Sequence, residues 1–308
     1  MFPDREDGPH GSYLTVGGKR LFVDIRGDRA APALLYLHGG PGTSCHEFMK
    51  WQGDLLSREL LLIGLDQRGV LRSDPVGPGD VLSEQVLVDD CEAIREALDL
   101  DGWSLLGHSF GGRVALRYAC QYPDRVATLI FENPAWDIRA TELARLPKLA
   151  AMLDGLGRAD EARQCRELAA RPDPFADGYP AGLIGPVLNS LGIHWYLADP
   201  GRSVQMAEAG PALPEALLQR AGAHGERLLA QPEFLESMLP LLPGLRMPAL
   251  LILGKSDLVT SPDQAEAFRR DVPDGRVRIF GTSGHFVQFE QAAEYAETVT
   301  GFVLGRFR

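Results

Sequence analysis

The spacing of apolar residues along the chain predicts that strands and helices alternate over most of its length. Short apolar runs between Gly, Pro and polar residues predict eight strands, near residues 12–16, 20–25, 33–37, 60–65, 103–106, 126–131, 249–253 and 276–280. Apolar positions at helical spacing predict helices near residues 45–58, 83–99, 110–121, 261–271 and 287–304. We therefore expect an α/β fold, with a mostly parallel eight-stranded sheet and helices on both faces. The first two strands have no helix between them, so they should pair antiparallel and turn at Gly17 and Gly18.

The alternation stops between residues 134 and 245. This stretch holds 12 of the chain's 22 prolines, with short helical patterns near 140–153 and 214–229 between Pro and Gly breaks. We expect a helical cap at 134–245, inserted into an α/β core formed by residues 1–133 and 246–308. Such a lobe would cover an active site and select substrates. The alternative is a packing appendage that does not contact substrate.

The strand near 103–106 runs directly into a candidate nucleophile. Residues 107–111 read Gly-His-Ser-Phe-Gly, a G-x-S-x-G pattern between a strand and a helix. In this arrangement the glycines allow a tight turn that lifts the serine hydroxyl clear of the sheet. Ser109 is thus the candidate nucleophile, although a serine at this place is also a common helix N-cap.

A serine nucleophile needs a base and a group that orients the base, and both follow later predicted strands. Asp257 follows the strand at 249–253, and His285 follows the strand at 276–280. The order Ser, Asp, His along the chain is the order of α/β-hydrolases. We predict a triad of Ser109, Asp257 and His285, and Glu132 at the end of the strand near 126–131 is the alternative acid.

An oxyanion hole should lie beside this triad. The N–H of Phe110, which follows the nucleophile, is one predicted donor. Residues 38–42 read His-Gly-Gly-Pro-Gly after an earlier strand, and we assign the second donor to the N–H of Gly40. We expect His38 to shape this loop through hydrogen bonds.

Three motifs together resemble the proline iminopeptidase family. They are His-Gly-Gly-Pro-Gly at 38–42, Asp-Gln-Arg-Gly at 66–69 and the serine motif at 107–111, and the resemblance covers roughly residues 10–133 and 246–308. It implies a serine peptidase of the α/β-hydrolase fold that releases an N-terminal proline or other residue. The chain departs from the family pattern at Leu71, where the family has Gly, and at His108 and Phe110, where it has Gly and Trp. The resemblance therefore implies the fold and the chemistry more strongly than proline specificity.

An aminopeptidase must bind a free ammonium group, and a buried carboxylate does this best. The candidates are Glu132 and the cap residues Glu208, Glu215, Glu226, Glu233 and Glu236. Trp136, with Trp195 and Tyr196, is a candidate wall of a small apolar pocket, although aromatic residues of a helical lobe often form its core.

Composition narrows the class of partner. A net charge of −11 argues against nucleic acid or an anionic membrane as a partner. The chain has no dinucleotide or phosphate-binding motif and no histidine pair at metal-ligand spacing, so we expect neither cofactor nor metal. No long apolar run or apolar leader is present, and four widely spaced cysteines are typical of free thiols, so we expect a cytoplasmic protein.

The sequence thus predicts a serine hydrolase that forms an acyl-enzyme with a small-molecule or short-peptide substrate. An aminopeptidase is the first hypothesis, and a carboxylesterase or small-amide hydrolase with the same triad is the second. A catalytically silent binding protein on the same scaffold is a remote third. The oligomeric state stays open.

Overall fold

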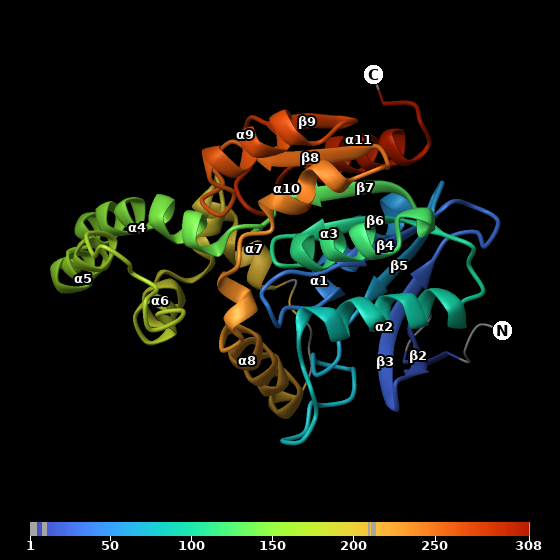
Figure 1. Cartoon of the computed structure of the whole chain (residues 1–308), viewed down its shortest axis with the longest axis horizontal. Helices are drawn as coiled ribbons and strands as arrows, with labels where there is room; N and C mark the ends of the chain where they lie inside the picture. The colour runs from blue at the N-terminus through green and yellow to red at the C-terminus, as the bar shows by residue number, and fades with distance from the viewer. Residues whose placement is uncertain (1–4, 8–10, 209, 211–213, 308) are drawn as a thin grey trace.

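The computed structural model describes residues 5–7, 11–208, 210 and 214–307 and is built on one nine-stranded sheet (Figure 1). Its strands lie in the order β1-β2-β3-β5-β4-β6-β7-β8-β9. All eight predicted strands are present, and β1 is an additional short strand that the apolar pattern does not indicate. The strands are β1 (Arg5–Asp7), β2 (Gly11–Val16), β3 (Lys19–Arg26), β4 (Ala33–Leu37), β5 (Leu61–Leu65), β6 (Trp103–His108), β7 (Val126–Glu132), β8 (Ala249–Gly254) and β9 (Gly275–Phe280).

The directions of the strands place the candidate loops at one edge of the sheet. As predicted, β2 and β3 pair antiparallel, and Gly17 and Gly18 turn the chain with φ of 54° and 75°. β3 also pairs antiparallel with β5, and every pair of neighbouring strands from β5 through β4 to β9 is parallel. Because β5 and β6 flank β4 on opposite sides, the chain changes direction there, which is where open α/β sheets bind ligands.

Alternating side chains of the buried strands build a separate apolar core on each face of the sheet. In β4, Leu35 and Leu37 belong to the core beneath α2, α3 and α9, whereas Leu34 and Tyr36 belong to the core beneath α1 and α11. The prediction of helices on both faces is therefore confirmed. These helices are α1 (His46–Leu56), α2 (Glu84–Ala97), α3 (Gly111–Gln121), α9 (Pro262–Asp271), α10 (Val287–Glu290) and α11 (Ala292–Val303).

The prediction of a single helix over residues 287–304 is wrong, because α10 and α11 are separated at Gln291. Gln291 has φ −128° and ψ 53°, outside the helical region. Its side-chain oxygen accepts hydrogen bonds from Thr282 N and Ser283 Oγ, and the neighbouring Glu290 carboxylate accepts one from Gly284 N. Tertiary contacts to the loop that carries His285 thus outweigh the local helical pattern.

Between β7 and β8 the described residues form helices and no strand, and Figure 1 shows α4, α5 and α6 projecting to the left of the sheet. The two helical patterns predicted there correspond to α4 and α8. We call the segment between β7 and β8 the helical lobe. Its elements are α4 (Ile138–Gly155), α5 (Ala159–Ala169), α6 (Ala181–Leu191), α7 (Ser203–Ala207) and α8 (Glu215–Leu229), with 3₁₀ turns η2 (Gly192–Tyr196), η3 (Pro200–Arg202), η4 (Pro232–Leu235) and η5 (Leu239–Gly244).

Buried arginine contacts join the lobe to the core. Arg113 of α3 is fully buried and pairs with Glu84 of α2 at 2.5 Å. Its remaining N–H groups donate to the carbonyls of Trp136, Glu233 and Glu236 in the lobe. One side chain on the helix after Ser109 thus fixes two stretches of the lobe.

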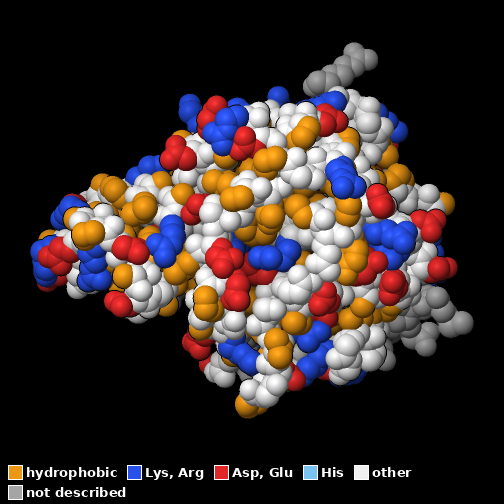
Figure 2. Space-filling view, viewed as in Figure 1, with side chains coloured by type: hydrophobic (Ala, Val, Ile, Leu, Met, Phe, Trp, Pro, Cys, Tyr) orange, Lys and Arg blue, Asp and Glu red, His pale blue; other side chains and the backbone are white. Residues whose placement is uncertain are grey.

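On the face drawn in Figure 2, acidic and basic side chains are interspersed, so the net charge does not gather there into one acidic patch. In the part of the chain that the structure describes, no helix is long and apolar enough to cross a membrane. The four cysteines are unpaired.

Candidate active site

Ser109 lies on a sharp turn between β6 and α3 that requires both flanking glycines. Its φ is +53°, a conformation that L-residues rarely adopt. A Cβ on Gly107 would lie 2.5 Å from the Gly111 carbonyl oxygen, and a Cβ on Gly111 would lie 2.1 Å from the Leu37 carbonyl oxygen. The G-x-S-x-G pattern is therefore the local requirement for holding Ser109 in this position.

Asp257 and His285 come from different strand ends and meet side by side. His285 Nδ1 lies 2.7 Å from Asp257 Oδ1, and Asp257 Oδ2 accepts a hydrogen bond of 2.7 Å from Thr260 N. Both side chains are almost fully buried. Burial lowers the pKa of His285 below 6.5, and the Asp257 carboxylate opposes this shift without reversing it. His285 is consequently neutral at pH 7, the form that can accept a proton.

Ser109 and His285 line the same cavity. Within the described residues, no hydrogen bond joins Ser109 Oγ to the His285 ring. Such contacts are often long without substrate and shorten when it binds.

Asn133, which the sequence analysis does not single out, connects these loops. Its Nδ2 donates to the carbonyls of Gly284 and His285, at 3.1 and 2.8 Å, and its Oδ1 accepts from Gly254 N at 3.0 Å. The residue is fully buried and has φ +43°, which Asn tolerates better than most residues. The signal in the sequence that could have identified Asn133 is its position directly after β7.

The loop after β4 brings Gly40 beside Ser109. Gly40 has φ +109°, and a Cβ there would lie 2.5 Å from Gly42 N. A Cβ on Gly39 would lie 2.8 Å from the Cβ of Ser109, so the loop approaches the serine closely. Phe110 follows Ser109 at the start of α3, and its ring is buried. No acceptor among the described residues takes up the N–H of Gly40 or Phe110.

The two other motifs of the sequence analysis form one hydrogen-bonded unit. His38 Nε2 accepts from Gln67 N at 3.1 Å, while its Nδ1 lies 3.0 Å from the Gly39 carbonyl oxygen. His38 therefore shapes this loop, as expected. Leu71 has φ +37°, so it adopts the backbone conformation that the family's glycine would favour.

Glu132 is not placed to contact substrate, contrary to the expectation. Its carboxylate is fully buried and accepts hydrogen bonds from Gln288 N and Tyr295 Oη, at 3.0 and 3.1 Å. It also lies 3.2 Å from His108 Nδ1 and lines neither of the cavities beside Ser109. Glu132 thus holds α10 and α11 to the sheet, and Asp257 is the acid that contacts His285.

Trp136 is also misassigned as a cavity wall. Its side chain is fully buried between Phe131 and Phe268, with ring centroids at 4.7 and 5.7 Å, so it forms core between β7 and α9. Trp195 and Tyr196 do line a cavity. The five glutamates proposed in the lobe are exposed and line neither cavity; they are Glu208, Glu215, Glu226, Glu233 and Glu236.

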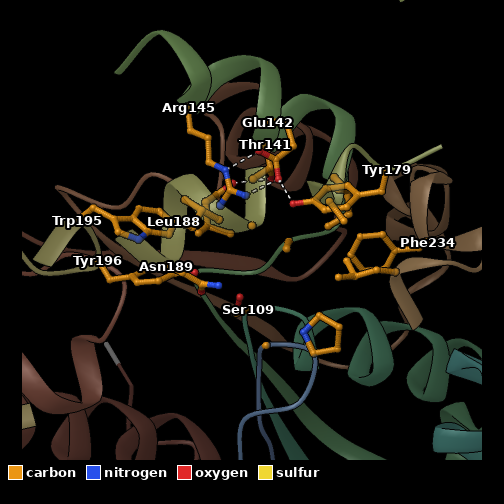
Figure 3. A pocket seen from close by; sticks show the side chains of 18 of the residues that line it. Ser109, Thr141, Glu142, Arg145, Tyr179, Leu188, Asn189, Trp195, Tyr196 and Phe234 are labelled. Carbon is orange, nitrogen blue, oxygen red and sulfur yellow. Dashed lines mark hydrogen bonds and ion pairs between the residues drawn. The ribbon is translucent and has the colours of Figure 1, made fainter. Parts of the chain in front are cut away.

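A cavity of about 380 Å³ between the lobe and the core contains a buried charge pair that sequence reasoning missed. Glu142 and Arg145 of α4 form a bidentate ion pair, and Tyr179 Oη donates to Glu142 at 2.8 Å. Figure 3 shows this group across the cavity from Ser109. Burial opposes the charge of Arg145, yet the Glu142 carboxylate raises its pKa above the usual value. We call this space the ion-pair cavity. In the sequence, Glu142 and Arg145 are three residues apart on a helix, a spacing that is also typical of exposed ion pairs, so the sequence does not reveal that the pair is buried.

A second cavity of about 410 Å³ lies on the His285 side of Ser109, and six of the 18 described residues that line it are Phe, Trp or Tyr. Trp51 and Phe289 pack with ring centroids 4.7 Å apart, and Phe48 and Phe286 complete the apolar wall. Glu47 also lines it, and burial raises the pKa of this carboxyl group. We call this space the aromatic cavity.

Across residues 5–7, 11–208, 210 and 214–307, no group of three or more His, Cys, Asp or Glu side chains is arranged to hold a metal ion.

Comparison with known proteins identifies the family. A family model described as the alpha/beta hydrolase fold matches residues 32–172. A protein of Mycoplasma pneumoniae named putative proline iminopeptidase is 31% identical over 294 residues, which cover 89% of this chain and 91% of that protein. The chain belongs to the proline iminopeptidase family.

A second relative is similar over nearly the whole chain, and a solved structure shows the same fold. The proline iminopeptidase of Lactobacillus delbrueckii subsp. bulgaricus is 28% identical over 314 residues, covering 96% of this chain and 97% of that protein. The crystal structure of proline iminopeptidase from Mycobacterium smegmatis superposes with a TM-score of 0.75 at 22% identity, covering 96% of this chain and 98% of that one. The α/β-hydrolase fold expected from the sequence is thus confirmed.

Proposed function

We propose that this member of the proline iminopeptidase family is a cytoplasmic serine aminopeptidase that releases N-terminal residues from short peptides or amides. The observation that carries the proposal is the 2.7 Å contact between Asp257 and His285 on the wall of a cavity that also contains Ser109. A neutral base held by a carboxylate beside a serine on a strained turn is the arrangement that acyl transfer requires. The unpaired cysteines support a reducing compartment.

In this mechanism, Ser109 Oγ attacks the substrate carbonyl carbon while His285 takes the hydroxyl proton. The N–H groups of Gly40 and Phe110 bind the negative oxygen that forms, and Asp257 stabilises the charged imidazole. His285 then gives its proton to the leaving amine as the C–N bond breaks. Water hydrolyses the acyl-enzyme with His285 acting again as base.

The helical lobe, residues 134–245, acts in this proposal as a cap that excludes water and selects substrate. Glu142 is the carboxylate that would bind the ammonium group, since it faces Ser109 across the ion-pair cavity. Its oxygens accept from Arg145 Nε, Arg145 Nη2 and Tyr179 Oη. A carboxylate has about four lone-pair sites, so about one is left for the substrate.

A carboxylesterase or small-amide hydrolase is the second candidate function. The observation in its favour is the bidentate ion pair between Arg145 and Glu142. Arg145 neutralises the charge of the carboxylate, which would otherwise attract the ammonium group of a peptide substrate.

Hydrolysis of matched substrates separates these functions. Proline, alanine and leucine p-nitroanilides are compared with their N-acetylated forms and with p-nitrophenyl acetate and butyrate at pH 7. We expect cleavage of the free-amine anilides, loss of cleavage on acetylation, and no turnover by a folded Ser109→Ala variant. Ester cleavage alone would favour the second candidate.

Labelling with a fluorophosphonate probe tests the serine itself. We expect the wild-type protein to be labelled at Ser109 and the Ser109→Ala variant to stay unlabelled. A folded protein that resists the probe would instead be a binding protein on this scaffold.

A further inference from the structure

The two cavities meet at the candidate nucleophile. Ser109, Gly40 and Tyr196 line both of them, so a carbonyl held at Ser109 directs one substituent into each cavity. The two spaces differ in their charged side chains, because the described wall of one holds the Glu142–Arg145 pair and that of the other holds Glu47 without a lysine or arginine. The substrate class therefore depends on which of the two cavities receives the leaving group.

The position of His285 determines that side. The imidazole that takes the proton of Ser109 must deliver it to the leaving atom, so the leaving group must lie within reach of His285. His285 lines the aromatic cavity and is absent from the described wall of the ion-pair cavity. The acyl group consequently faces Glu142, and the departing amine or alcohol enters the aromatic cavity.

We infer that the aromatic cavity is a leaving-group site for amines or alcohols that bear an aromatic ring and carry no carboxylate. This inference rests on the proposed acyl transfer at Ser109. In the step concerned, the bond from the carbonyl carbon to the leaving nitrogen or oxygen breaks as the proton of His285 moves to that atom. The product leaves as a neutral amine or alcohol, and the acyl group stays on Ser109.

The walls of the aromatic cavity account for the aromatic preference. Trp51 and Phe289 pack in a tilted arrangement, with ring centroids 4.7 Å apart and an angle of 59° between the ring planes. Phe48 is buried and lines the same cavity, and Met206 of the lobe also lines it. Offset and tilted ring contacts of this kind favour a further aromatic ring. A volume of about 410 Å³ accommodates a residue-sized group rather than a long peptide.

Glu47 accounts for the exclusion of a carboxylate. Glu47 is the one carboxylate among the described residues that line this cavity. It accepts a hydrogen bond of 3.2 Å from Ser44 Oγ. No lysine or arginine belongs to the described wall. A free C-terminal carboxylate on the leaving residue would thus meet a like charge with no lysine or arginine on the described wall to bind it, which is unfavourable in a confined space.

Three prolyl substrates with the same acyl group test the inference: prolyl-glycinamide, prolyl-phenylalaninamide and prolyl-phenylalanine. We expect kcat/KM for phenylalaninamide to exceed that for glycinamide by at least about tenfold, because an aromatic side chain is removed from water. Prolyl-phenylalanine should be slower than its amide, and Glu47→Gln should reduce this difference by at least about fivefold.

Variants in the two cavities separate acylation from deacylation. Trp51→Ala should lower the phenylalaninamide to glycinamide ratio by roughly tenfold, since the lost contacts act only before the leaving group departs. It should leave unchanged the steady-state rate after the p-nitrophenol burst, which reports deacylation. Leu188→Ala, in the ion-pair cavity, is the matched control and should change deacylation while preserving the leaving-group ratio.

The inference would be overturned by equal kcat/KM values on the two amides. It would also be overturned if Trp51→Ala altered deacylation and left the phenylalaninamide to glycinamide ratio unchanged. Fluorophosphonate labelling distinguishes this result from failure of the proposed function. A protein that is labelled at Ser109 but shows no leaving-group preference rejects the leaving-group site alone. A protein that is not labelled rejects the acyl transfer on which the inference rests.

Discussion

In the loops around Ser109, the close approach of neighbouring backbones limits which residue types fit at single positions. A Cβ on Gly284 would lie 2.3 Å from the Tyr196 carbonyl oxygen, which accepts a 2.6 Å hydrogen bond from His285 N. The lobe therefore contacts the backbone that carries His285, and only glycine fits at the contact. Asn133 holds the same loop from the sheet side. The His285 ring is thus positioned by two elements that lie far apart in the sequence.

The titration of His285 should appear in the pH dependence of activity. Burial lowers the pKa of His285 below 6.5, against the opposing effect of Asp257, while His108 lowers it further and Glu132 raises it. Because the neutral ring is the base, kcat/KM should persist below pH 6.5 and be lost only as the pH falls through the lowered pKa.

A pH–rate profile on a p-nitrophenyl ester checks this expectation. Asp257→Asn should lower kcat/KM by roughly 10³–10⁴-fold, as in other triads where the orienting carboxylate is removed. An acidic limb with its midpoint above pH 6.5 would contradict the neutral buried base.

At the scale of elements, α3 connects the serine turn to the lobe. The helix starts beside Ser109, and its Arg113 pairs with Glu84 of α2 and binds three lobe carbonyls. Arg117, one turn later, pairs with the same Glu84 but is 29% exposed in its side chain. The two arginines therefore share a partner and differ in burial and in their contact with the lobe.

This difference predicts unequal effects on stability. Arg113→Met should lower the free energy of unfolding by about 3–5 kcal/mol, since it leaves the Glu84 carboxylate and the lobe carbonyls without their buried partner. Arg117→Met should lower it by about 1 kcal/mol or less. Chemical denaturation of both variants provides the measurement, and equal losses would show that burial of Arg113 is unimportant.

At the scale of the whole molecule, α8 joins the lobe to the loops after β4 and β5. His224 Nδ1 lies 2.8 Å from the Arg68 carbonyl oxygen, and a Cβ on Gly225 would lie 2.8 Å from the Pro41 carbonyl oxygen. Burial lowers the pKa of His224 to about 3 and that of His38 to about 4. Both rings are therefore neutral in the folded protein at pH values where the unfolded chain is protonated.

Stability should consequently fall in mild acid. The unfolded histidines bind protons below about pH 6.5 while the folded ones do not, so the stabilisation present above pH 6.5 is lost as the pH falls toward 4. For His38 alone the loss is roughly 3 kcal/mol over this range, at about 1.4 kcal/mol for each pH unit. Chemical denaturation between pH 7 and pH 4 measures it.

The variant His224→Gln retains an N–H donor for the Arg68 carbonyl and removes the titration. Its free energy of unfolding should depend less steeply on pH than that of the wild-type protein between pH 6.5 and 4. Parallel curves for the two proteins would show that His224 is not buried in its neutral form.

The predictable parts of this protein are those that depend on local spacing. Strand and helix periods identified the eight main strands and the core helices except for the break between α10 and α11, since burial on a sheet face or a helix face repeats at a set interval. The glycines around Ser109 and Gly40 marked tight turns because a side chain there would clash with nearby backbone. The motifs at 38–42 and 66–69 indicated the family because each is a short run of adjacent residues that can be read directly from the sequence. In the structure, the hydrogen bond from Gln67 N to His38 Nε2 joins the two motifs.

What the sequence by itself determined was therefore the α/β architecture, the family and the loops that would carry Ser109, Asp257 and His285. Only the tertiary structure decided that Asp257 rather than Glu132 contacts His285, that Trp136 is core, and that Glu142 and Glu47 face the two cavities. The physical reason is that burial and pairing of a side chain depend on residues brought together by the fold. A carboxylate on an exposed helix face and one facing a cavity carry the same signal in sequence, and packing alone distinguishes them.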